Sequence, residues 1–163
     1  MKTLYCSLLI ILALVLSSCN NDDPIIRGHD IDVVLYISVQ DENGNDLLDP
    51  HNQYEKSIKT DAIKLIYLQD GEESIVRHNH YLIDPSIGED RYILGLTLNY
   101  QSTISTTYVQ WSEIDRDIFE AEIYRNKNEG KGVVTTCTSL KLNGKLVWPL
   151  PDSKVGRRIT IIK

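Results

Sequence analysis

One segment of the chain carries oxygen-bearing side chains at alternate positions, which is the spacing of a calcium-binding loop. These side chains belong to Asp41, Asn43, Asn45 and Asp49. Carboxylate and amide oxygens at this spacing can surround one hard cation. However, the sixth position of the segment is Asp46, where an EF-hand loop needs Gly, and its twelfth position is not Glu. We therefore interpret the segment as a solvated turn, keep the four residues as candidate ligands only, and expect neither a metal nor a cofactor.

Two histidines and one cysteine are the other residues that could ligate a metal or act as nucleophiles. His78 and His80 stand two positions apart in a segment that is typical of a strand, so both imidazoles are expected on one face. Zinc needs at least one more ligand, and no residue completes the set convincingly. An exposed polar strand face is the preferred interpretation. Cys137 lies in an apolar stretch and is expected to be a small core residue.

Aromatic side chains could stack on the apolar faces of sugar rings while tyrosine hydroxyls make polar contacts. The candidates for such a site are Tyr108, Trp111 and Trp148, and both tryptophans end their predicted strands. Tyr92 and Tyr100 alternate with leucines of the same predicted strand and are expected in the core. We therefore interpret the aromatic residues first as core and second as a glycan-binding platform.

The sequence contains no motif that indicates catalysis. A glycine-rich phosphate loop and a G-x-S-x-G nucleophile elbow are both absent from it. Carboxylates are plentiful, but the separation of a glycosidase pair is a property of the fold. The net charge of −6 argues against a nucleic-acid partner, since phosphate binding depends on clustered Lys and Arg. We expect a protein that is not an enzyme, with a hydrolase as the least favoured alternative.

The N-terminal segment carries the most specific chemistry in the chain. After Lys2 comes an apolar run at 4–16, which is shorter than the roughly 20 residues that span a bilayer. The run ends in Leu16-Ser17-Ser18-Cys19, which resembles the lipobox of bacterial lipoproteins. That resemblance implies removal of residues 1–18 as a signal peptide and attachment of lipid, including palmitate, to Cys19. The alternative is an ordinary signal peptide cleaved after the small residues, with Cys19 as a free thiol.

Three parts of the chain follow from this interpretation. They are a lipoprotein signal peptide at 1–18, an acidic flexible tether at 19–30, and a folded domain at 31–163. The acidic residues after Cys19 are similar to the surface-export signal of Bacteroidota lipoproteins. We therefore expect lipid anchoring in the outer membrane, with exposure at the cell surface as an option.

The folded domain has the composition and turn spacing of a β-protein. Ile, Val, Thr and Tyr are abundant, whereas Ala and Met are scarce. Apolar and polar residues alternate with a period of two at 31–40 and 91–100, and no convincing amphipathic helix appears. Further strands are predicted at 62–68, 74–81, 105–111, 118–125, 132–142, 145–148 and 158–162. This pattern predicts an all-β fold, an antiparallel β-sandwich of eight or nine short strands.

Two motifs carry a second resemblance. The segment DENGNDLLDP at 41–50 and the segment NGKLVW at 143–148 are similar to those of small predicted lipoproteins of gut Bacteroidota. The resemblance implies an immunoglobulin-like or related β-sandwich and brings no assigned activity, so Cys19 is the only functional residue that carries over. The expected function is that of an outer-membrane, lipid-anchored, non-catalytic binding or structural accessory. Its expected partners are the membrane, through the lipid on Cys19, and a glycan or another envelope protein. The alternative is a surface glycan-binding lipoprotein of a polysaccharide-uptake system.

Overall fold

The fold consists of β-strands and two short 3-10 turns, as the abundance of β-branched residues predicts. The computed structural model describes residues 28–52, 54–128, 132–149 and 156–163, and these residues contain no α-helix. The strands are β1 (His29–Asp32), β2 (Val34–Gln40), β3 (Lys64–Gln69), β4 (Glu72–Val76), β5 (His80–Ile83), β6 (Ile93–Thr97), β7 (Ile104–Gln110), β8 (Arg116–Asn128), β9 (Gly132–Leu142), β10 (Lys145–Trp148) and β11 (Arg158–Ile162). The 3-10 turns are η1 (Thr60–Ala62) and η2 (Pro85–Ile87).

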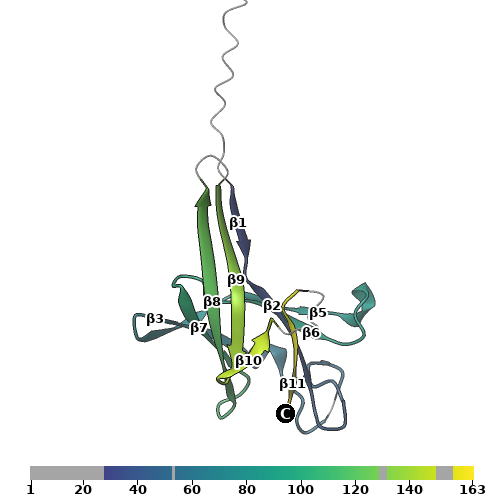
Figure 1. The fold of residues 1–163 in the computed structure, drawn as a ribbon. Helices are drawn as coiled ribbons and strands as arrows, with labels where there is room; N and C mark the ends of the chain where they lie inside the picture. The colour runs from purple at the N-terminus through teal and green to yellow at the C-terminus, as the bar shows by residue number, and fades with distance from the viewer. Residues whose placement is uncertain (1–27, 53, 129–131, 150–155) are drawn as a thin grey trace, which may run out of the picture.

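Two sheets pack against each other, which confirms the predicted all-β sandwich class (Figure 1). The larger sheet has the order β1-β9-β8-β7-β3-β4, and β10 also pairs with β9. The smaller sheet has the order β11-β2-β6-β5. Most neighbouring strands are antiparallel, but β1 pairs with β9 in parallel and β11 pairs with β2 in parallel. The sheets are therefore mixed, because the N-terminal and C-terminal strands join them without hairpins.

The predicted number of eight or nine strands is wrong, because two of the predicted strands each divide into two. The segment predicted at 31–40 breaks at Val33, so that β1 lies in the larger sheet and β2 in the smaller. The segment predicted at 74–81 breaks at 77–79, where His78 has a φ of 64°. Its two halves, β4 and β5, also lie in different sheets. Each break is a corner at which the chain crosses the sandwich.

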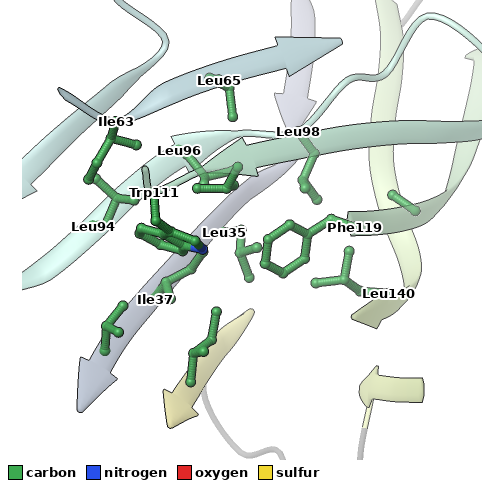
Figure 2. Packing of buried hydrophobic residues seen from close by; sticks show 14 of the residues in the cluster. Leu35, Ile37, Ile63, Leu65, Leu94, Leu96, Leu98, Trp111, Phe119 and Leu140 are labelled. Carbon is green, nitrogen blue, oxygen red and sulfur yellow. The ribbon is translucent and has the colours of Figure 1, made fainter. Parts of the chain in front are cut away.

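The core lies between the sheets and is aliphatic apart from a few larger side chains. Leu35, Ile37 and Phe119 are each 0% exposed. Figure 2 shows Phe119 and Trp111 among aliphatic side chains from both sheets. Full burial of an apolar side chain of this size contributes about 1.5–3 kcal/mol. The predicted alternation at 31–40 is confirmed from Val33 to Ile37, but Ser38 on the predicted outer side is also buried, and Ile31 on the predicted inner side is 43% exposed.

Strands β1, β8 and β9 extend beyond the rest of the sandwich as an arm (Figure 1). We call this three-stranded extension the arm. A buried arginine, Arg157, attaches its base to the sandwich. The Nε atom of Arg157 donates to the Val34 carbonyl at 3.0 Å and its Nη1 to the Cys137 carbonyl at 3.4 Å. Its Nη2 atom also pairs with the Asp32 carboxylate. Because these partners belong to β1, β2 and β9, one side chain connects both sheets.

Candidate functional site

Trp111, predicted as an aromatic platform residue, is a core side chain. It is 3% exposed, and its Nε1 donates to Asp117 Oδ2 at 2.7 Å. The Lys163 ammonium lies 3.1 Å from the same carboxylate oxygen, and Asn143 Nδ2 donates to the other oxygen at 2.8 Å. Burial raises the pKa of Asp117, but the hydrogen bonds from Asn143, Trp111 and Lys163 outweigh it and hold the pKa below its ordinary value. Trp111 is therefore part of a buried polar network and offers no ring face to a ligand.

The two other predicted platform residues lie in different parts of the molecule. Tyr108 is half-buried on the outer face of the larger sheet, with the Arg116 guanidinium 3.5 Å from its ring centroid. Trp148 is half-buried on β10 and packs against the core, with the Arg157 guanidinium 5.3 Å from its ring centroid. The structure thus does not bring Tyr108, Trp111 and Trp148 together.

The predicted calcium-loop side chains are used to fix their own turn. The Asp41 carboxylate accepts from the backbone amides of Asn43 and Asn45 at 2.9 and 2.8 Å, and from Asn45 Nδ2 at 2.7 Å. These interactions lower the pKa of Asp41, with the Asn45 side chain as the largest cause. Asp49 accepts from the His51 amide at 2.8 Å. Within the part of the chain that the structure describes, no group of three or more His, Cys, Asp or Glu side chains could hold a metal ion.

The histidine pair is not on one strand, which corrects the expectation for His78 and His80. His78 lies in the corner between β4 and β5 and is exposed, whereas His80 begins β5 and is half-buried. Burial, and after it the nearby His78, lowers the pKa of His80. Cys137 is 1% exposed, and burial raises the pKa of its thiol. The thiol is a small core side chain, as its apolar neighbours predict.

An exposed aromatic surface does exist, but on residues that sequence reasoning assigned to strands without a role. Tyr81, Gly95, Tyr36 and Arg158 are direct partners across β5, β6, β2 and β11. Directly paired residues share one face of a sheet. That face points away from the core, because Leu35 and its alternate neighbours fill the other side. We call this row of four residues the tyrosine face.

The hydroxyl end of the Tyr81 ring lies directly over Gly95. A Cβ atom on Gly95 would stand 2.5 Å from Tyr81 Cζ and 2.9 Å from its hydroxyl oxygen, so only glycine leaves room for the ring. Tyr81 is nevertheless 51% exposed, so much of the side chain is accessible to solvent. Burial, and after it the hydroxyl of Tyr36, raises the pKa of Tyr81. The phenol is therefore neutral over the physiological pH range.

Arg158 occupies the other end of the tyrosine face. Its guanidinium lies 5.1 Å from the centroid of the Tyr36 ring. Its two terminal nitrogens donate to the two Glu89 oxygens at 2.8 and 2.7 Å. This bidentate hydrogen bonding, which is the largest effect on the carboxylate, lowers the pKa of Glu89. The guanidinium is thereby held in place at the β11 end of the tyrosine face.

A surface depression of about 340 Å³ adjoins the tyrosine face at Tyr36. Polar groups of β2 and β11 form its floor, where the hydroxyls of Ser38 and Thr160 are 2.8 Å apart. Glu89, Asp90 and Arg91 form its wall, from the loop between η2 and β6. A flat aromatic ring beside a small polar depression can bind a ligand that has both an apolar face and hydroxyl groups.

One signal in the sequence could have found this site. Gly95 interrupts the apolar run of the 91–100 segment, and a glycine inside a strand marks a bulge or the close approach of another group. The identity of that group could not be inferred, because Tyr36 and Tyr81 meet only through the pairing of β2, β6 and β5.

The expectations for the signal peptide, for lipidation of Cys19 and for the tether up to residue 27 lie outside the described residues. Among the described residues, no helix has the length and apolar character needed to cross a membrane. Comparison with protein-family models, with curated proteins and with solved structures finds no match to this chain.

Proposed function

We propose that this chain is an outer-membrane lipoprotein whose β-sandwich is a non-catalytic carbohydrate-binding domain, with the tyrosine face and its adjoining depression as the binding site. The observation that carries the proposal is the Tyr81 ring, whose hydroxyl end lies over Gly95 while the residue remains 51% exposed. Sugar rings have an apolar face that stacks on such a ring, and their hydroxyl groups need polar partners at its edge. The depression supplies a hydroxyl partner through the exposed Thr160, which also hydrogen-bonds with the buried Ser38 hydroxyl.

The state of the nearby carboxylate supports binding rather than hydrolysis. A glycosidase needs one carboxyl group with a raised pKa, which acts as the general acid. Glu89 has a lowered pKa, and both of its oxygens accept hydrogen bonds from Arg158. It is therefore ionised at neutral pH and holds Arg158 in position.

The anchor is the second half of the proposal and rests on the N-terminal sequence. The apolar run at 4–16 followed by Ser17-Ser18-Cys19 supports lipid attachment at Cys19. Each buried lipid CH₂ contributes about 0.8 kcal/mol, so several acyl chains hold a protein stably at a membrane. We expect Cys19→Ala to move the protein to the soluble fraction and to abolish labelling with radioactive palmitate. Persistence of both membrane fractionation and labelling in this variant would refute the anchor.

Binding is tested with purified domain in native gels that contain soluble polysaccharides, where binding slows migration. We expect Tyr81→Ala to weaken the retardation by at least about tenfold in apparent affinity, which corresponds to about 1.4 kcal/mol. Tyr124→Ala is the matched control, because Tyr124 is a similarly exposed tyrosine, 53% against 51%, on β8 of the other sheet. Equal behaviour of the two variants, or no retardation of the wild type by any polysaccharide, would contradict the proposed site.

A further inference from the structure

A surface groove of about 910 Å³ lies between two loops of the sandwich. The loop at 55–62, which precedes β3, forms one wall, and the loop at 111–115, between β7 and β8, forms the other. Most of the surface that lines the groove is apolar, and the half-buried Ile58 and the exposed Ala62 supply part of it. A contiguous apolar surface of this kind, unlike a single exposed apolar residue, marks a site of interaction.

The loop at 112–115 carries Ile114, which is 99% exposed although it borders this apolar groove. The loop itself is fixed, because the backbone amides of Trp111 and Ser112 donate to the Asp115 carbonyl at 2.9 and 3.3 Å. The Ile114 amide also donates to the Ser112 hydroxyl oxygen at 3.3 Å. We call the loop at 112–115 the knob. It presents Ile114 to solvent in a preformed position, which reduces the entropy cost of binding.

The two walls of the groove differ in charge. The knob contains Glu113 and Asp115, and the Lys163 ammonium lies 2.7 Å from an Asp115 oxygen. The opposite wall contains Lys56 and Lys59 against a single glutamate. Within the described part of the chain, no ion pair involves Glu113 or either of these lysines. A negatively charged knob therefore stands beside a positively charged wall, and each matches the other in charge.

We propose that this surface joins two copies of the chain in a symmetric dimer, in which the knob of each copy enters the groove of the other. A two-fold contact requires both complementary halves on one surface, and the knob borders the groove. Ile114 of one copy would contact Ile58 and Ala62 of the other, and Glu113 would lie beside the lysines. This charge complementarity favours a second copy over an acyl chain, which would use the apolar surface alone.

The contact is small, because each copy contributes only the two loops and Lys163. Stable interfaces bury about 1,200–2,000 Å² in total, and smaller ones belong to transient complexes. We therefore expect a reversible dimer. The groove shares no lining residue with the depression beside the tyrosine face, so the dimer is independent of the proposed carbohydrate site. If both proposals hold, the dimer carries two such sites and gains avidity for a polymer.

The first test is analytical ultracentrifugation of the purified domain at 28–163, which contains both sheets and the described core. We expect the mass of the wild type to rise toward that of a dimer as the protein concentration increases. Ile114→Ser should weaken dimerisation by at least about tenfold, because it removes the central apolar contact. Ile104→Ser is the matched control, since Ile104 is 68% exposed at the opposite end of β7 and should leave the dimer unchanged.

Charge reversal tests how the two copies are arranged. Glu113→Lys places like charges across the contact, and so does the double variant Lys56→Glu, Lys59→Glu, so each should dimerise at least about tenfold more weakly than the wild type. Mixed in equal amounts, the two variants restore opposite charges at both knobs, and we expect them to form a heterodimer. An ion pair within a single copy would not give this rescue.

The outcomes decide the proposal. A monomer at every concentration up to the millimolar range would overturn it, and so would an unchanged dimer in Ile114→Ser, because the contact would then lie elsewhere. Failure of the two charge variants to associate when mixed would overturn the exchange of knobs. A monomer that binds a fluorescent fatty acid, with binding weakened by Ile114→Ser, would show that the groove takes an acyl chain instead of a second copy.

Discussion

The substitution Gly95→Ala separates the binding surface from the fold. The Cβ of alanine would stand 2.5 Å from Tyr81 Cζ, whereas carbon atoms in ordinary contact are about 3.5–4.0 Å apart. The Tyr81 ring must therefore move by at least about 1 Å. Because this ring is the free end of a side chain on edge strand β5, it can swing outward without moving the backbone.

The expected cost to stability is small. Gly95 is not among the residues with a positive φ, so its backbone conformation suits alanine. Alanine in place of glycine within a strand gains about 0.5–1 kcal/mol from reduced backbone entropy of the unfolded chain. This gain offsets much of the lost contact between the ring and Gly95. We expect the free energy of unfolding to change by less than about 1 kcal/mol and the Tm by less than about 5 °C.

Binding should respond much more strongly than stability. The displaced ring no longer lies over Gly95 in the row with Tyr36, and we expect an affinity loss of about tenfold in the native-gel assay. NMR provides a test without a ligand, because an aromatic ring this close to Gly95 shifts the resonances of the glycine α-protons. Unshifted α-protons in the wild type, or full affinity in Gly95→Ala, would refute the reasoning. A large loss of stability would show that Tyr81 is held rigidly and that the glycine serves the fold.

Three further predictions concern the framework. Asp117→Asn should lower the free energy of unfolding by about 1.5–3 kcal/mol, because the largely buried carboxylate gives up charged hydrogen bonds and the half-buried Lys163 ammonium keeps only its other partner, Asp115. Folding lowers the pKa of Asp117, so the stabilisation that its carboxylate gives the wild type is fully present at neutral pH. The stability difference between wild type and variant should shrink as the pH falls below the ordinary carboxyl pKa of 3.8. Urea unfolding at several pH values would measure this difference. Phe119→Ala should cost about 3–5 kcal/mol in the same measurement, since Phe119 is fully buried. Arg157→Met should speed amide hydrogen exchange in β1 with little effect on β7, and uniform acceleration would contradict its local role.

Much of the strand content could be predicted because local chemistry decides it. Asn143-Gly144 forms the predicted two-residue hairpin loop with positive φ values of 49° and 80°. The alternation of leucines at 93–98 places Leu94, Leu96 and Leu98 in the core as expected. These features depend on neighbours in the sequence, and the sequence is sufficient to predict them.

The remaining features depend on partners that are distant in the chain. The run at 31–40 alternates without interruption, but β1 pairs with β9 about a hundred residues later, whereas β2 pairs with β6 and β11. No local pattern marks the change of sheet at Val33. Trp111 was predicted to end its strand, but β7 ends one residue earlier, at Gln110. The burial of Trp111 depends on Asp117 and Lys163, which lie later in the chain, and so could not be predicted from its neighbours.

The attachment of the arm has a mechanical consequence. A pull on the N-terminal end of β1 acts along the strand and passes through Val33 into β2, which is hydrogen-bonded on both sides by β6 and β11. Such a force loads the hydrogen bonds of β2 in shear, where many must break together, rather than one at a time as in peeling. Tyr36 lies on this same strand. A molecule bound across β5, β6, β2 and β11 would brace the strand that carries a force applied at the N-terminal end of β1.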